Sequence, residues 1–512
     1  MKIGIYNRYW NTFGGGEKHV GVIAEILSQH FDVDLIGTEP VNLSELCSQL
    51  DLSLPNVRYV MWPPLHCGEL SSLTKKYDLF INSTYCSPLA SMAKKSVYLV
   101  FFPHWLVPVA FSPVADAFVS VLKSFAAPEI VPLSGFYGLE SNGICWGGGK
   151  AWVRLRTSMF DSRSEARIPI WDYRSDLKHR LLSVKGEGIC WSLNGEELVI
   201  KRIKQPTKAV DLCIFTKTFI PAESGYNEDT RHLGIGLNLY GLRRKRYLYV
   251  YKHWINRMVS RMPTRSFVST YDYFIANSQF TRTWLLRRWG RESVVLNPPV
   301  KTGKFKPPSM NRKKRVILSV GRFFAGGHNK KHIKMLKAFR GMCDRGEIPE
   351  GWEYHIVGKV HREREVHVRY FSKVQRLAVG YPVKVLADLR FSDLLNEYHS
   401  ASIFWHAAGW GEDENRHPER CEHFGMSTCE AMSAGCIPVV VAKAGQLEIV
   451  HDGKNGFTFT SEKEIVQKTK RLIATHDSRA MVKLANSAMD TVKKFSREKF
   501  RERVMAFISG II

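Results

Sequence analysis

Two acidic residues stand eight positions apart in the segment Glu422-His-Phe-Gly-Met-Ser-Thr-Cys-Glu430. If a helix begins at Gly425–Ser427, its free amides and positive dipole end suit a phosphate or a sugar hydroxyl. Eight residues at ~1.5 Å each separate the carboxylates by up to about 12 Å, which matches the span of a diphosphate between a sugar and a ribose. Each carboxylate could then accept hydrogen bonds from vicinal hydroxyls at one end. An ordinary capped helix with two surface acids would show the same spacing.

Basic residues lie upstream of this segment. Arg322 follows a predicted strand at Arg315–Val320, and Lys330 opens a predicted helix at Lys330–Cys343. The two cations could neutralise charge on a departing diphosphate. Lys331 competes with Lys330 for this role. In a chain with a formal net charge of +26, such a pair also arises without a function.

A glycine run, Gly14-Gly15-Gly16-Glu17-Lys18, joins the first predicted strand to the first predicted helix. Backbone without side chains at a helix N-terminus lets a phosphate or a sugar approach closely. The run lacks the G-x-G-x-x-G spacing, so it does not indicate a dinucleotide site. A tight turn alone would explain two of the three glycines.

Strands that alternate with helices predict an α/β fold with parallel sheets in two parts of the chain. The predicted strands are Lys2–Asn7, Asp32–Ile36, Val57–Met61, Leu79–Asn82, Val97–Phe102, Tyr273–Ala276, Arg315–Val320, Tyr354–Val357, Val383–Ala387, Ile403–His406 and Ile437–Val441. Between residues 126 and 247 the pattern changes to short β-like runs with Gly, Asn, Asp and Pro between them. An Asn194-Gly195 turn there predicts a hairpin.

The longer string around Glu430 carries a family resemblance. Glu430 continues as Ala-Met-Ser-Ala-Gly435-Cys-Ile-Pro-Val, and Ala444 to Phe457 extends the match. The chain resembles retaining glycosyltransferase family 4, of the GT-B fold, whose hallmark is Glu-x7-Glu followed by Ala-Met-x-x-Gly-x-Pro-Val. One extra residue stands here between the glycine and the proline. The resemblance covers roughly residues 1–125 and 250–500.

The resemblance implies two doubly wound Rossmann-like domains that face each other across a cleft, with an all-β insertion in the first. We expect an N-terminal acceptor domain at 1–125 and 248–298, an inserted module at 126–247, most simply a sandwich, and a nucleotide-sugar domain at 299–490. A C-terminal helix at 491–512 would pack back on the N-terminal domain. The resemblance leaves the insertion unexplained; it could bind carbohydrate or only shape a cleft.

The resemblance also assigns roles. Glu422 would contact the donor sugar and Glu430 the ribose hydroxyls. Arg322 and Lys330 would bind the donor diphosphate, although they stand eight residues apart rather than about five. His104, after the strand at 97–102, would lie near the reacting sugar, but a histidine there can also be structural. The expected catalytic residues are His104, Arg322, Lys330 and Glu422. The expected donor-binding residues are Gly15, Gly16, Arg322, Lys330, Lys331, His423, Phe424, Gly425, Met426, Ser427 and Glu430.

The implied reaction moves a sugar from a nucleoside diphosphate, with a lean towards GDP-mannose, to a glycan or lipid-linked acceptor in polysaccharide or glycoconjugate synthesis. We expect retention and no cofactor or metal. The Asp-x-Asp at Asp32–Asp34 opens a strand instead of following one, and the acidic run Glu412–Glu414 is expected to be solvated. The ten cysteines show no zinc spacing.

Charge leaves two alternatives open. Lys and Arg outnumber Asp and Glu by 74 to 48, and the runs Arg243–Arg246 and Arg312–Arg315 suit a nucleic-acid-binding protein. The second alternative is a non-catalytic carbohydrate-binding protein on the same scaffold. We prefer docking of the basic, aromatic stretch Tyr247–Arg261 on an anionic membrane surface, with no nucleic acid. No signal peptide or 18-residue apolar run is present, so a cytoplasmic or peripheral location is expected.

Overall fold

The computed structural model describes residues 1–62, 67–106, 114, 117–119, 121–122, 129–137, 144–171, 181–203, 209–223, 232–238, 255, 266–307, 313–362 and 364–512. The expected docking stretch Tyr247–Arg261, except Ile255, and the run Arg243–Arg246 lie outside these residues. The chain divides into two compact units. The first comprises Met1–Leu99 and His104–Phe274, and the second comprises Val100–Pro103 and Ile275–Ile512.

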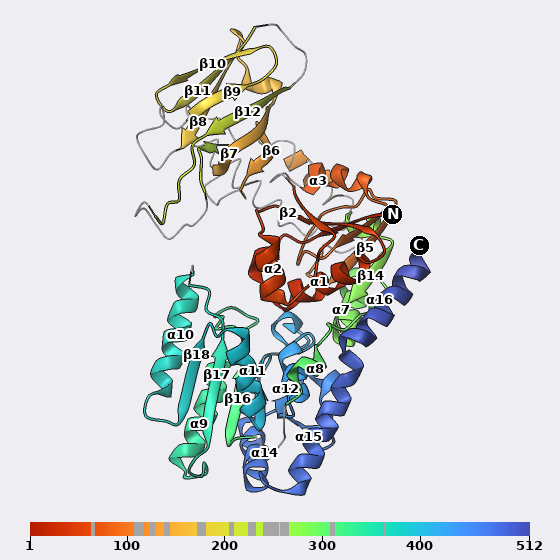
Figure 1. Cartoon of the computed structure of the whole chain (residues 1–512), viewed down its shortest axis with the longest axis vertical. Helices are drawn as coiled ribbons and strands as arrows, with labels where there is room; N and C mark the ends of the chain where they lie inside the picture. The colour runs from red at the N-terminus through yellow and green to blue at the C-terminus, as the bar shows by residue number, and fades with distance from the viewer. Residues whose placement is uncertain are drawn as a thin grey trace. The chain divides into compact units, whose positions relative to one another are not determined.

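A parallel sheet forms the framework of the first unit (Figure 1). Its strand order is β15-β14-β5-β4-β1-β2-β3. The strands are β1 (Lys2–Tyr6), β2 (Asp32–Gly37), β3 (Val57–Met61), β4 (Leu79–Asn82), β5 (Lys95–Val100), β14 (Tyr273–Ala276) and β15 (Val294–Val295). The last residue of β5, the last two residues of β14 and all of β15 are counted with the second unit. The helices that alternate with them are α1 (Gly15–Leu27), α2 (Leu43–Leu50) and α3 (Cys67–Leu73). Near-continuous apolar strands such as Ile3–Tyr6 are buried because helices cover a parallel sheet on both faces.

The described residues of the insertion form β-strands and one short 3-10 helix, Thr157–Met159, in agreement with the predicted β module (Figure 1). Its strands are β6 (Ile130–Phe136), β7 (Ile144–Leu155), β8 (Glu165–Trp171), β9 (Leu181–Lys185), β10 (Ile189–Asn194), β11 (Glu197–Arg202), β12 (Val210–Thr216) and β13 (Gly236–Asn238). They form one antiparallel sheet, ordered β10-β11-β8-β13-β7-β12-β9, with β6 paired to β7. The predicted hairpin is confirmed, because Asn194 pairs with Glu197 and Gly195 takes a left-handed φ of 60°. The sandwich form and the domain boundaries stay predictions.

A second parallel sheet, ordered β18-β17-β16-β19-β20-β21, forms the framework of the second unit. Its strands are β16 (Val316–Val320), β17 (Glu353–Gly358), β18 (Val383–Ala387), β19 (Ile403–His406), β20 (Ile437–Val441) and β21 (Phe457–Phe459). Its helices are α7 (Gln279–Trp289), α8 (Thr302–Phe305), α9 (His332–Asp344), α10 (Glu365–Ala378), α11 (Phe391–Ser400), α12 (Met426–Ser433), α13 (Gln446–Ile449), α14 (Glu462–Ala474), α15 (Arg479–Val492) and α16 (Arg497–Ile511). The packing of α16 on the N-terminal domain stays a prediction.

Alternate residues of each central strand in the second sheet enter different cores. Ile317 and Trp405 belong to the cluster that contains Met335 of α9. Their neighbours Leu318 and Phe404 belong to the cluster with Cys429 of α12 and Val492 of α15. The sheet is therefore buried on both faces, as a doubly wound α/β unit requires.

Candidate functional site

The carboxyl ends of the strands in the second sheet bring the expected site residues together. Gly321 and Arg322 directly follow β16, and His406 is the last residue of β19. Because the strands are parallel, these ends share one edge of the sheet, the usual location of ligand sites in this architecture. Glu422 lies at the same edge, 2.9 Å from His406.

The Glu422 carboxylate is held by two groups. Its Oε2 atom forms an ion pair with Lys330 Nζ and lies 2.9 Å from His406 Nε2. Burial raises the pKa of Glu422, but Lys330 and His406 outweigh burial and hold the pKa well below its usual range. The side chain is therefore an anion, although only 13% of it is exposed. Among the described residues, no hydrogen bond reaches Oε1, so this oxygen can accept one from a ligand.

The two neighbouring lysines point to different carboxylates. Lys331 has a left-handed φ of 60° and pairs with Glu412, while Lys330 pairs with Glu422. Helix α9 begins at His332, so the prediction that Lys330 opens the helix was wrong by two residues. The left-handed residue turns one lysine away from the other. A Cβ on Gly321 would lie 2.6 Å from Lys330 Cγ, so the lysine stem crosses this glycine.

Only Asp413 of the acidic run Glu412–Glu414 is exposed as the sequence suggested. The Glu412 side chain is 16% exposed and pairs with Lys331 and with Arg420, the latter at 3.2 Å. Glu414 accepts a hydrogen bond from the Ala444 amide at 3.1 Å. These carboxylates fix the loop before Glu422 instead of facing water.

Helix α12 begins where the sequence predicts. Gly425 is its N-cap, with a left-handed φ of 116°, and Met426 and Ser427 are its first, half-buried residues. A Cβ at Gly425 would lie 2.6 Å from Gln446 Nε2, so only glycine fits. The first amides of a helix have no partner within the helix and favour an anion. Glu430, on the second turn, accepts a hydrogen bond from the Tyr398 hydroxyl at 3.0 Å.

His423 lies between aromatic rings of the second unit. It stacks on Phe102 at a centroid distance of 4.3 Å and lies 5.0 Å from the ring of His328. Burial lowers the pKa of His423 well below its usual range and the pKa of His328 to about 4. Both imidazoles are therefore neutral. Phe424, expected at the donor, is 3% exposed and packs on Phe495, so its side chain belongs to the core.

Arg322 differs from these residues because it is exposed. Within the described part of the chain, no carboxylate pairs with its guanidinium. An exposed guanidinium at the carboxyl edge of the sheet is available to bind a phosphate in a bidentate manner.

Gly15, Gly16 and His104 belong to the first unit. Gly15 begins α1, and the Glu17 carboxylate accepts hydrogen bonds from the Gly14 amide at 3.0 Å and from the Thr12 hydroxyl at 2.7 Å. A carboxylate at this helix end disfavours a phosphate and leaves a sugar hydroxyl as the better ligand. His104 is half-buried and stacks on Phe267 at 6.1 Å.

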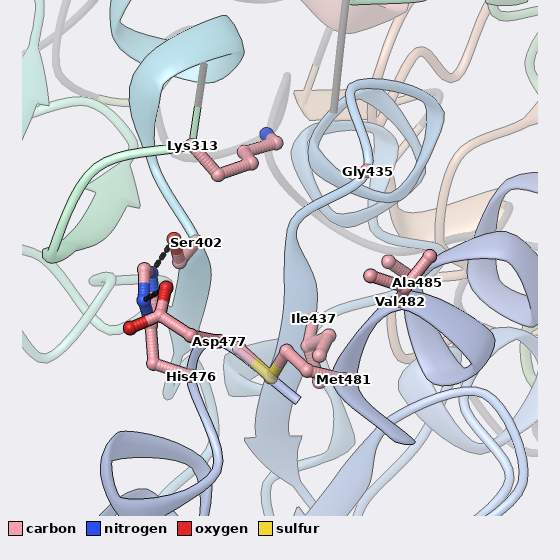
Figure 2. Close-up of a pocket in the computed structure, with 9 residues that line it drawn as sticks. All are labelled: Lys313, Ser402, Gly435, Ile437, His476, Asp477, Met481, Val482 and Ala485. Atoms are coloured by element: carbon pink, nitrogen blue, oxygen red, sulfur yellow. Dashed lines mark hydrogen bonds and ion pairs between the residues drawn. The ribbon is translucent and has the colours of Figure 1, made fainter. Parts of the chain in front are cut away.

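A cavity of about 160 Å³ opens at the opposite, amino-terminal edge of the second sheet (Figure 2). It is lined by Lys313, Ser402, Gly435, Ile437, His476, Asp477, Met481, Val482 and Ala485. Ser402, His476 and Asp477 form a hydrogen-bonded row there, with distances of 2.8 and 3.0 Å. The row does not make a nucleophile, because Ser402 donates its proton to the Lys314 carbonyl at 2.6 Å and the Asp477 side chain is 81% exposed.

Sequence reasoning missed three residues of the site: His406, Thr428 and Gln446. His406 was predicted only as the end of a strand, and Gln446 only as part of the string that continues from Ala444. Each is nearly fully buried, and a buried polar side chain leaves no local periodic signal.

Comparisons with known proteins agree with this architecture. Residues 300–488, which lie in the second unit, match the family model of the glycosyl transferases group 1. GDP-Man:Man(3)GlcNAc(2)-PP-Dol alpha-1,2-mannosyltransferase of Dictyostelium discoideum is 24% identical over 241 residues. That match covers 44% of this chain and 44% of the length of the relative.

Solved structures match over the whole chain. HepE from Anabaena, in complex with UDP-glucose, has a TM-score of 0.52 at 13% identity, with all of both chains covered. Sucrose-phosphate synthase from Thermosynechococcus elongatus has a TM-score of 0.54 at 12% identity, covering 100% of this chain and 99% of its own. A glycosyltransferase from Rickettsia africae has a TM-score of 0.53 at 11% identity, covering 100% and 98%. The chain therefore has the GT-B fold, with a β-rich insertion in its first part.

Proposed function

We propose that this chain is a nucleotide-sugar-dependent glycosyltransferase that transfers a sugar to an acceptor hydroxyl with retention. One observation carries the proposal. Glu422 is an ionised, partly buried carboxylate with one unoccupied oxygen among the described residues, and it precedes a glycine-capped helix that carries Glu430. The match of residues 300–488 to the glycosyl transferases group 1 supports it.

In the proposed reaction, Glu422 Oε1 accepts a hydrogen bond from a hydroxyl of the donor sugar, and Glu430 holds the ribose. Lys330 has three N–H donors, and only one is needed for Glu422. The remaining donors, the Arg322 guanidinium and the amides of Met426 and Ser427 stabilise the departing diphosphate. We propose that these cations do so without a metal ion.

The proposed donor is GDP-mannose, and the proposed acceptor is a lipid-linked glycan. The relative from Dictyostelium is named for GDP-Man and for a PP-Dol-linked acceptor, which supports both choices. The complex of HepE with UDP-glucose makes that nucleotide sugar the first competitor in any screen. Among the described residues, no helix is both long and apolar enough to cross a lipid bilayer. Docking on an anionic membrane stays a prediction.

A thermal-shift screen of the purified chain against a panel of nucleotide sugars tests the proposal. We expect one nucleotide sugar to raise the melting temperature, and Glu430→Ala to abolish the shift because the ribose loses its acceptor. Glu462→Ala, at an exposed glutamate that begins α14, is the matched control and should keep the shift. A panel that leaves the melting temperature unchanged would contradict the proposal.

The same preparation separates the two alternatives. A nucleotide sugar that shifts the melting temperature without hydrolysis or transfer would indicate a non-catalytic carbohydrate-binding protein. Tight nucleic-acid binding that falls steeply with salt, without any nucleotide-sugar shift, would indicate a nucleic-acid-binding protein.

A further inference from the structure

His406 is a buried imidazole with both ring nitrogens in contact with polar groups. It is 2% exposed. Its Nε2 atom lies 2.9 Å from Glu422 Oε2, and its Nδ1 atom lies 3.3 Å from Gln446 Nε2. Gln446, which is fully buried, also accepts a hydrogen bond on Oε1 from the Thr428 hydroxyl at 3.0 Å. Thr428, Gln446, His406 and Glu422 therefore form one continuous polar chain.

Only one placement of protons satisfies this chain. Glu422 is an anion that accepts, so the imidazole must present an N–H from Nε2. Burial lowers the pKa of His406, so the ring is neutral and Nδ1 is an acceptor. Nδ1 therefore requires the amide NH₂ of Gln446, which leaves the Gln446 carbonyl for the Thr428 hydroxyl. The opposite amide orientation would place the lone pair of Nε2 against the carboxylate.

The backbone around Gln446 also holds the loop that carries Glu422. The Gly445 amide donates to the Glu422 carbonyl at 2.9 Å. A Cβ at Gly445 would lie 2.2 Å from the His423 carbonyl oxygen, and a Cβ at Gly425 would lie 2.6 Å from Gln446 Nε2. The start of α13 is thus packed directly against the residues on both sides of Glu422.

We propose that Gln446 and Thr428 are positioning residues that fix His406 in its Nε2–H tautomer and so orient Glu422. His406 and Lys330 then both occupy Oε2, which leaves Oε1 as the single acceptor for a sugar hydroxyl that donates a hydrogen bond. This inference rests on the proposed function, because the hydroxyl belongs to the proposed nucleotide sugar.

The titratable groups that face His406 are Glu422, Lys330 and His332. Glu422 favours the charged imidazole, whereas Lys330 and burial disfavour it. Burial lowers the pKa of His332 to about 3, so this neighbour is neutral. A second carboxylate beside Nδ1 would change this balance and stabilise an imidazolium.

Gln446→Glu provides the sharpest test. At low pH, an imidazolium would donate to both Glu422 and the introduced carboxylate, and the donor should bind as in the wild type. As the pH rises and the ring loses its proton, the two carboxylates compete for one N–H. The measured quantity is the dissociation constant of Gln446→Glu for the best nucleotide sugar, divided by the wild-type value at the same pH. We expect this ratio to rise about tenfold between pH 6 and pH 8.5. About tenfold corresponds to the loss of one hydrogen bond to a charged group.

Thr428 offers a matched pair of variants. Thr428→Val removes the hydroxyl and keeps the shape, so it should weaken donor binding, whereas Thr428→Ser keeps the hydroxyl and should restore it. Circular dichroism and thermal unfolding of each variant show that it folds. A pH-independent ratio for Gln446→Glu, or equal affinities for Thr428→Val and wild type, would overturn the inference.

A spectrum without ligand separates this inference from the proposed function. In ¹⁵N-histidine-labelled full-length protein, the His406 signals should show Nε2 protonated and Nδ1 unprotonated, with assignment by His406→Asn. The Nδ1–H tautomer in the wild type would overturn the inference even if the donor binds. Failure of every nucleotide sugar to bind would instead remove the proposed function, and the spectrum would still decide the tautomer.

Discussion

Replacing Lys330 by methionine tests the electrostatics of the candidate site. Methionine keeps an unbranched stem to cross Gly321 but removes the charge that pairs with Glu422. The ion pair is largely enclosed, since the Lys330 and Glu422 side chains are 16% and 13% exposed. Removing one partner of a buried pair costs about 3–5 kcal/mol, because the other charge stays buried without compensation. We expect the lower end, about 3 kcal/mol, because His406 Nε2 still lies 2.9 Å from the carboxylate.

The size of this loss should depend on pH. In the wild type, Lys330 helps to hold the pKa of Glu422 well below its unfolded value of about 4.3. The stabilisation is therefore complete above about pH 4.3 and lost only as the pH falls through the folded pKa. Without Lys330, burial raises the pKa, so the variant gains stability as the carboxyl group takes up a proton. The difference between the two proteins should narrow from pH 7 to pH 5.

Hydrogen exchange of the slowest amides in β16 and β19 measures the free energy of unfolding of this unit within the whole chain. Lys331→Met is the matched control, because Glu412 keeps its second partner, Arg420, at 3.2 Å. It should lose only about 1 kcal/mol, the net value of an ordinary hydrogen-bonded contact. Equal losses in the two variants, or a Lys330→Met loss that does not change with pH, would refute the assignment of Lys330 to Glu422.

Two further predictions follow from exposure and from backbone geometry. Arg322→Ala should change the free energy of unfolding by no more than about 0.5 kcal/mol, because the side chain is exposed. It should weaken nucleotide-sugar binding about tenfold or more in calorimetry. Unchanged affinity would remove Arg322 from the site. Gly425→Ala should destabilise the chain by about 1–3 kcal/mol in urea unfolding, because it adds strain at φ 116° and a contact with Gln446. Gly453→Ala, where φ is 71° and no atom lies within 4 Å of the added Cβ, should destabilise the chain less than Gly425→Ala. A larger loss of stability in Gly453→Ala would contradict this reason.

The elements of the two parallel sheets could be predicted from the sequence because their signals are local. The predicted bounds of β3, β4, β18, β19 and β20 agree with the structure at both ends. β20 is a continuous apolar run, and β4 and β19 are each three apolar residues before a polar one, which is how buried parallel strands read. β3 and β18 each carry one basic residue among apolar ones. Very short strands carry too few residues to show a periodic pattern. β15 and β21, with two and three residues, were therefore not predicted.

The candidate site was predictable only where its residues are contiguous. The segment from Glu422 to Glu430 lies on one turn and one helix, so its spacing alone indicated two carboxylates and a helix N-terminus. Whether Lys330 or Lys331 faces Glu422 depends on the left-handed backbone of Lys331, which no pattern in the string reveals. Glu412 was misjudged for the same reason, because its partners are Lys331, 81 residues earlier, and Arg420.

The partners of Glu422 bear on the proposal that Glu422 and Glu430 bind different ends of one ligand. Glu422 receives a cation and an imidazole on one oxygen, so it is a fixed anion that presents its other oxygen. Glu430 receives the hydroxyl of Tyr398 and lies on the second turn of α12. A carboxylate fixed by two groups suits a hydroxyl whose position must be held during bond cleavage, whereas a ribose that only binds makes no such demand. Therefore Glu422→Gln should lower the rate of transfer more than the affinity, and Glu430→Gln should lower the affinity more than the rate. Steady-state kinetics with the donor from the panel would separate the two effects, and equal changes in both variants would contradict this division of roles.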